Sequence, residues 1–65
     1  MFQIGDVVRI ISKGIFQGQE VKIVKVDPAT SHRRRTKDWY LLPISHANGV
    51  FQGWFETSEI ELVTP

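Results

Sequence analysis

Residues 39–55 of the chain read WYLLPISHANGVFQGWF, and this stretch decides the fold. Two runs rich in aromatic, aliphatic and β-branched residues, 39–44 and 50–55, lie on either side of the dipeptide Asn48-Gly49. An Asn-Gly pair between two such runs is a strong signal for a hairpin turn. The stretch therefore predicts two antiparallel β-strands rather than a helix.

Alternation of side chains along these two runs assigns an inner and an outer face. The expected inner residues are Tyr40, Leu42, Ile44 and Phe55, and the expected outer residues are Trp39, Leu41, Pro43 and Trp54. Because Pro43 has no N–H to donate, it is expected at a sheet edge or a bulge. Large rings are unusual on the surface of a monomer and are common in binding hot spots. Trp39 and Trp54, with Leu41 as an apolar neighbour, are therefore candidate partner-binding residues.

Three further short β runs lie outside this hairpin. The first opens at Gly5-Asp6 and places Val8 and Ile10 on its inner face, with Phe2 and Ile4 in the same phase. The second covers residues 21–26, where Lys22 and Lys25 have opposite phase, which predicts a β-bulge or a strongly bent strand. The last has Ile60 and Leu62 on its inner face, with Glu59 and Glu61 on its outer face.

These five strands predict an all-β fold for residues 1–65, taken as a single domain. Helical periodicity is absent, and at most one short helical turn is expected, near Thr57-Ser58-Glu59. Five short strands are too few for an ordinary two-sheet sandwich, whereas a small, partly open barrel avoids long exposed edges. A five-stranded, mainly antiparallel SH3-like barrel is the expected architecture.

Composition excludes several classes of function. The chain has 42% hydrophobic residues, no Cys and a formal net charge of +1, which indicates a compact globule without disulfides. His32 and His46 are far apart and follow no metal-ligand spacing, so no metal and no cofactor are expected. No nucleophile motif is present, so an enzyme is not expected. The chain lacks a long apolar run, and we expect a cytoplasmic protein without membrane insertion.

Positive charge is concentrated in one segment, at about residues 28–37. Arg33, Arg34, Arg35 and Lys37 supply four of the eight Lys and Arg residues, and Trp39 follows closely. Two interpretations stay open for this segment. It is either a solvated loop that keeps the protein soluble, or a contact for an acidic protein surface or a phosphate backbone. Arginine favours such contacts because its guanidinium binds oxygen pairs with two donors.

The N-terminal half resembles the KOW motif of NusG-type transcription factors and several ribosomal proteins. The resemblance lies in residues 4–10 (IGDVVRI), 14–20 (GIFQGQE) and 22–27 (KIVKVD), although Val21 stands where that motif usually has Gly. It implies a small barrel and the possibility of RNA or single-strand binding, which here would use Arg33, Arg34 and Arg35 with Trp39.

The C-terminal half resembles SH3 domains, in residues 38–42 (DWYLL) and 53–60 (GWFETSEI). Trp39 matches the aromatic residue that lines the SH3 peptide groove. Glu56 and Glu59 replace the Pro and the Tyr of that pattern, so recognition of proline-rich peptides is not expected.

A third similarity concerns the turn Phe16-Gln17-Gly18-Gln19. It resembles a turn that is often found in accessory subunits of cyanobacterial and plastid electron-transfer complexes. Fold-level likeness does not establish an activity. The residues therefore favour a small docking module that binds a protein partner. Nucleic-acid binding and a role as an accessory subunit of a larger complex are the alternatives.

Overall fold

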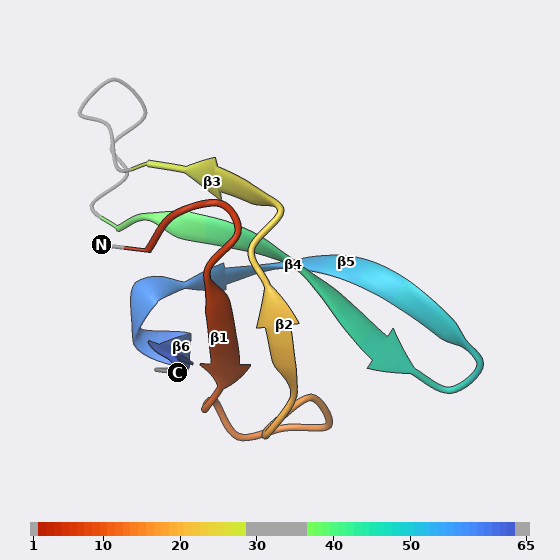
Figure 1. Cartoon of the computed structure of the whole chain (residues 1–65). Coiled ribbons are helices and arrows are strands. Elements are labelled where there is room, and N and C mark those ends of the chain that lie inside the picture. The colour runs from red at the N-terminus through yellow and green to blue at the C-terminus, as the bar shows by residue number, and fades with distance from the viewer. Residues whose placement is uncertain (1, 29–36, 64–65) are drawn as a thin grey trace.

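The fold of residues 2–28 and 37–63 is described by a computed structural model of the chain (Figure 1). In chain order its elements are β1 (Val7–Ile10), β2 (Glu20–Lys22), β3 (Lys25–Asp27), β4 (Trp39–His46), β5 (Gly49–Glu56), the 3₁₀ turn η2 (Thr57–Glu59) and β6 (Ile60–Leu62). The expected all-β class is confirmed. The helical turn lies where the sequence predicts it.

The strands form two antiparallel sheets of three strands each. One has the order β2-β1-β6 and the other has the order β3-β4-β5. Among the described residues, strand pairing does not close the two sheets into a barrel, and the strands number six rather than the expected five. The SH3-like barrel accordingly stays a prediction, whereas the antiparallel pairing is confirmed.

The extra strand arises because residues 21–26 are split between the two sheets. β2 ends at Lys22, and the side chain of Ile23 is then buried, with only 1% of its surface exposed. Val24 donates its N–H to the carbonyl oxygen of Leu41 at 3.0 Å, while Lys25 is also aligned with Leu41. Val24 and Lys25 thus both lie opposite Leu41, and two residues opposite one is the arrangement of a β-bulge. The bulge explains why Lys22 and Lys25 are both exposed despite their opposite phase.

A single hydrophobic core lies between the sheets. Its buried members are Val8, Ile10, Ile23, Tyr40, Leu42, Ile44, Phe55 and Ile60. Leu42 is fully buried and Ile60 is 3% exposed, so the prediction that these two residues face inward is confirmed. Phe2 packs edge-on against Tyr40, with ring centroids 5.3 Å apart.

Two residues with the expected inner phase are nevertheless exposed. Ile4 is 66% exposed because a turn comes before β1, in which the Asp6 N–H donates to the Gln3 carbonyl and Gly5 has a φ of 95°. This turn breaks the alternation, so the prediction for Ile4 is wrong. Leu62 shares the phase of the buried Ile60, but it lies at the end of a short edge strand and is 48% exposed.

The turn η2 connects the two sheets at the C-terminal end. The carboxylate of Glu59 accepts a hydrogen bond from the N–H of Glu56 at 3.0 Å, as in a helix capping box. Glu59 therefore belongs to the turn and not to the outer face of β6, which corrects the sequence expectation. Glu61 alone of the two carboxylates lies on that strand.

The hairpin of β4 and β5 contains the two longest strands of the described residues (Figure 1), and its far end is held to the loop before β2 by the hydrogen bonds between Gln19 and Ser45. His46 pairs with Gly49, so the two turn residues are Ala47 and Asn48 rather than the Asn-Gly pair itself. Ala47 has a φ of 54°. The position of the turn is confirmed, but β5 begins one residue earlier than expected, at Gly49.

Candidate functional site

The outer face of the β3-β4-β5 sheet brings three predicted contact residues together. Leu41 on β4 lies directly opposite Trp54 on β5, so their side chains share one face. Trp39 lies two residues from Leu41 on the same face. Trp54 is 44% exposed, and Trp39 and Leu41 are partly buried. We call these three residues the outer apolar patch.

Charged residues border the outer apolar patch. Lys25 lies opposite Leu41 on the β3 side, and Trp39 has Asp27 opposite it on β3 and Glu56 opposite it on β5. The ring of Trp39 is therefore flanked by two carboxylate residues in register. Sequence reasoning missed this border, because only the strand register shows which charges lie beside the patch.

Lys37, a predicted contact residue, is bound within the molecule. Its ammonium nitrogen lies 3.2 Å from Oε1 of Glu56, and its side chain is 57% exposed. The hydroxyl of Ser58 donates to the same oxygen. Hydrogen bonding from Ser58 and then from Lys37 lowers the pKa of Glu56 below its ordinary value. Lys37 thus neutralises a carboxylate beside the outer apolar patch.

Arg33, Arg34 and Arg35 lie outside the described residues, as does most of the basic segment. The two ends of that segment are nevertheless defined. Asp27, at the end of β3, is aligned with Trp39, at the start of β4. The basic segment therefore leaves and re-enters the fold at the Trp39 end of the outer apolar patch.

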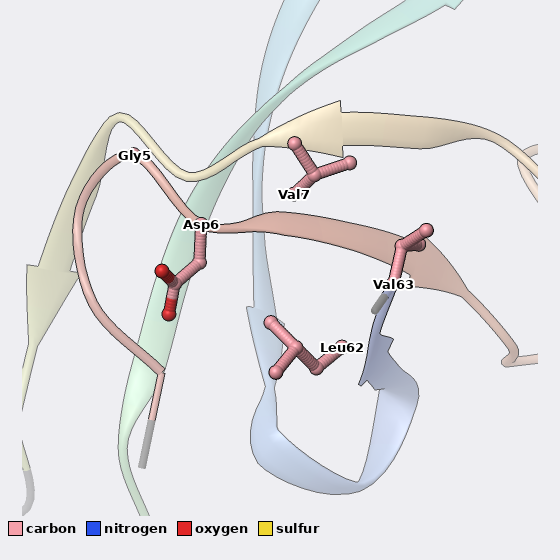
Figure 2. Close-up of a pocket in the computed structure, with 5 residues that line it drawn as sticks. All are labelled: Gly5, Asp6, Val7, Leu62 and Val63. Atoms are coloured by element: carbon pink, nitrogen blue, oxygen red, sulfur yellow. The ribbon is translucent and has the colours of Figure 1, made fainter. Parts of the chain in front are cut away.

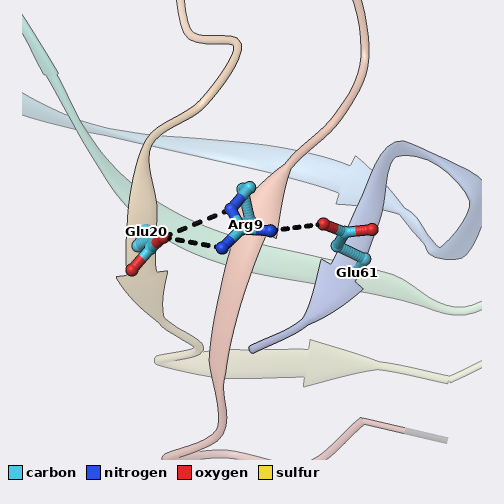
Figure 3. Close-up of polar contacts among 3 residues, drawn as sticks. All are labelled: Arg9, Glu20 and Glu61. Atoms are coloured by element: carbon cyan, nitrogen blue, oxygen red, sulfur yellow. Dashed lines mark hydrogen bonds and ion pairs between the residues drawn. The ribbon is translucent and has the colours of Figure 1, made fainter. Parts of the chain in front are cut away.

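The outer face of the other sheet is ionic. Arg9, on the central strand β1, lies between Glu20 of β2 and Glu61 of β6, and its guanidinium binds both carboxylates, at 2.9 and 2.7 Å (Figure 3). Hydrogen bonding to Glu20 and then to Glu61 raises the pKa of Arg9. Glu61 is held by Arg9 while Glu59 caps a turn, so these two carboxylates do not form an acid/base pair.

A hollow of about 440 Å³ lies near the two ends of the chain, lined by Gly5, Asp6, Val7, Leu62 and Val63 (Figure 2). Its one charged residue, Asp6, accepts a hydrogen bond from the Gln3 N–H at 2.9 Å and so stabilises the turn before β1. The remaining lining residues carry no group for catalysis, and the sequence gives no signal for this hollow.

Two other classes of site are missing from the described part of the chain. Residues 2–28 and 37–63 contain no group of three or more His, Asp or Glu placed to hold a metal ion. In the same ranges, no helix has the length and apolar character needed to cross a membrane. Comparison with known proteins gives no match to a family model, to a curated protein or to a solved structure.

Proposed function

We propose that this protein is a cytoplasmic, non-enzymatic docking module that binds a protein partner through the outer apolar patch and the adjacent basic segment. The observation that supports this proposal is the register that places Trp54 opposite Leu41 on an exposed sheet face. Tryptophan at the centre of an interface commonly contributes a large share of the binding free energy. An SH3-like barrel with a KOW-like N-terminal half is the proposed fold family, supported by the two small antiparallel sheets around one core.

A protein partner is preferred over nucleic acid because of the charges beside Trp39. Asp27 and Glu56 lie on either side of Trp39 in the sheet. Trp39 thus lies between two acidic residues, whereas single-strand binders place aromatic rings along a basic groove. Arg33, Arg34 and Arg35 supply the opposing argument, so KOW-like binding of RNA or single-stranded DNA is the second candidate.

The resemblance to accessory subunits of electron-transfer complexes rests on residues 16–19, whose contacts stabilise the fold. Phe16 packs against the core, and the side chain of Gln19 binds both backbone groups of Ser45, at 2.8 and 2.9 Å. A role in a larger complex is consistent with a docking module. This turn gives it no separate support.

The test compares proteins that co-purify with tagged wild type and with Trp54→Ala. Truncating an aromatic hot spot lowers affinity by about 2 kcal/mol or more, so a specific polypeptide retained by wild type should be lost. Lys22→Ala is the matched control, because Lys22 is exposed on the other sheet and should leave the partner bound. Circular dichroism of both variants establishes that they are folded. Equal recovery with wild type and Trp54→Ala would contradict the proposed surface.

A second measurement separates protein from nucleic-acid binding. Mixed-sequence single-stranded RNA and DNA are titrated at about 150 mM salt, near physiological ionic strength. We expect weak binding, because the formal net charge of the chain is only +1. Sub-micromolar affinity would favour the nucleic-acid candidate, provided that Arg34→Ala reduces the log–log salt slope by about 0.7–0.9, the contribution of one phosphate contact.

A further inference from the structure

One edge of β5 has no strand beside it in the described residues. β5 pairs with β4 along its whole length, and no other described strand pairs with it. The backbone carbonyl of Leu41 accepts a hydrogen bond from the Val24 N–H, and both backbone groups of Ser45 are bound by the side chain of Gln19. Because these partners lie outside β5, the odd-numbered residues of β4 direct their backbone N–H and C=O groups away from β5.

The pairing of Leu41 with Trp54 then determines which residues of β5 face the open edge. In an antiparallel ladder, two residues that lie directly opposite each other direct their backbone groups either both toward each other or both away from each other. Trp54, Gln52 and Val50 therefore present their N–H and C=O groups to the open edge. Glu56 also directs its backbone groups away from β4, since its N–H donates to the carboxylate of Glu59.

The other edges of the two sheets carry the protection that native proteins use against strand pairing. β2, β3 and β6 are only three residues long. Beyond Leu41, the outer edge of β4 has Pro43, which lacks a donor, and then Ser45, whose backbone groups are occupied by Gln19.

β5 has none of these protections. It is eight residues long, contains no Lys or Pro, and carries its one charge at its end, on Glu56. Val50 is 68% exposed, Phe51 is 56% exposed and Trp54 is 44% exposed. A long, apolar, unpaired edge of this kind is a template for adding another strand.

We propose that the added strand is β5 of a second copy of this chain, paired antiparallel about a two-fold axis at Gln52. In that register Gln52 faces Gln52 of the partner copy, and Val50 faces Trp54 of the partner copy. All three of these residues present backbone groups to the open edge, so each facing pair exchanges both N–H···O bonds.

The side chains fit this register. On the outer face the β-branched Val50 meets the ring of Trp54 of the partner copy, a favourable cross-strand pair. On the inner face Phe51 meets Gly53 of the partner copy, where no side chain competes for space. Glu56 meets Asn48 of the partner copy, so the register brings no like charges together. This self-complementarity selects a second copy over an unrelated strand.

The resulting dimer has a continuous sheet in the order β3-β4-β5-β5-β4-β3. Because both copies use the same edge, the symmetry is closed and the assembly stops at two copies. The two outer apolar patches then lie on the same face of the shared sheet. The dimer does not depend on the proposed function, although it would give a docking partner two adjacent contact surfaces.

The first test measures oligomeric state and amide exchange as functions of protein concentration. Sedimentation velocity should show a monomer–dimer equilibrium between micromolar and millimolar protein. On dimerisation, exchange should slow at Val50, Gln52 and Trp54 and stay unchanged at Phe51 and Gly53, whose amides already face β4. A monomer at every concentration, or protection without this alternation, would overturn the proposal.

The second test uses opposite charges at the two-fold axis. Gln52 is exposed, so Gln52→Lys and Gln52→Glu should each fold normally, yet each places like charges directly opposite one another. We expect dimerisation of either variant to weaken about fivefold or more. Mixing the two variants should restore a heterodimer, because the ammonium introduced in one copy would then face the carboxylate introduced in the other.

Gln17→Lys is the matched control, since Gln17 is exposed in the loop before β2 and belongs to neither strand of the β4-β5 hairpin. It makes the same charge change and should dimerise like wild type. The proposal fails if Gln52→Lys dimerises as tightly as wild type. It also fails if the Gln52→Lys and Gln52→Glu variants do not recover dimerisation when mixed.

Discussion

The outer faces of the two sheets differ in the chemistry at their centres. On the β2-β1-β6 sheet the central strand presents Arg9 between two carboxylates. On the β3-β4-β5 sheet the central strand presents Trp39 and Leu41, with Trp54 opposite Leu41. Both faces cover the same core, so the core does not require an apolar residue on either of them.

An ionic row of this kind is an ordinary solvated surface. Exposed ion pairs contribute little to stability and keep a sheet face compatible with water. The exposed ring of Trp54 and the partly buried ring of Trp39 on the opposite sheet have no such explanation, since an apolar patch in a small domain adds a tendency to associate. The contrast therefore supports the proposal that a partner binds on the β3-β4-β5 sheet.

The largest expected effect separates the inner from the outer face of β4. Leu42 is fully buried, so Leu42→Ala should lower the free energy of unfolding by about 2–5 kcal/mol. Ile60→Ala should behave similarly, because Ile60 is 3% exposed. For a domain this small, either loss is a large part of the total stability. Urea denaturation measures the effect.

Leu41→Ala is the matched control, because Leu41 is the adjacent residue on the opposite face and is only partly buried. Its loss in stability should be clearly smaller than that of Leu42→Ala. Equal losses would mean that Leu41 is a structural residue, and the outer apolar patch would then have no need of a partner.

The difference between these two leucines was predictable from the sequence. Strict alternation in residues 39–44 needs no knowledge of distant contacts, so the inner and outer faces of β4 follow directly. The exposure of Ile4 was not predictable in this way. Its phase depends on a turn in which Gly5 has a positive φ and Asp6 binds Gln3.

The strand register was beyond the reach of the sequence pattern. Alternation assigned Trp54 to an outer face, but it could not show that Leu41 rather than Pro43 lies opposite it. It also could not show that the side chain of Ile23 is buried in the core and that Lys25, two residues later, belongs to the second sheet. These features depend on contacts between distant residues, for which local propensity gives no signal. The site residues 33–35 lie outside the described residues, so their contribution stays a prediction.

An intermediate effect is expected at the attachment between the sheets. The side chain of Gln19, just before β2, accepts from the Ser45 N–H and donates to the Ser45 carbonyl. Gln19→Ala removes both hydrogen bonds and should lower the free energy of unfolding by about 1–3 kcal/mol, at about 0.5–1.5 kcal/mol for each bond. Amide exchange at Ser45 should become faster, because its N–H loses its partner.

Gln17→Ala controls for the loss of a glutamine side chain in the same loop and should change the stability little. If Gln19→Ala were as stable as wild type, the end of the β4-β5 hairpin would be held by other contacts. The protection of the β4 edge by Gln19 would then be less important than the two hydrogen bonds indicate.

The smallest effect concerns the ionic contact that borders the outer apolar patch. Because Ser58 and Lys37 lower the pKa of Glu56 in the folded protein, the ionised carboxylate stabilises the fold at neutral pH. This contribution is complete above the ordinary Glu pKa of 4.5, and it disappears as the pH falls through the lowered value.

Glu56→Gln keeps an acceptor oxygen but removes the charge. The difference in unfolding free energy between wild type and Glu56→Gln should therefore shrink below about pH 4.5. Ser58→Ala and Lys37→Met should each reduce this pH dependence, because each removes one of the two donors that lower the pKa of Glu56. Urea midpoints measured from pH 7 to pH 3 test this, and a difference that does not change with pH would show that Glu56 is not stabilised by these two donors.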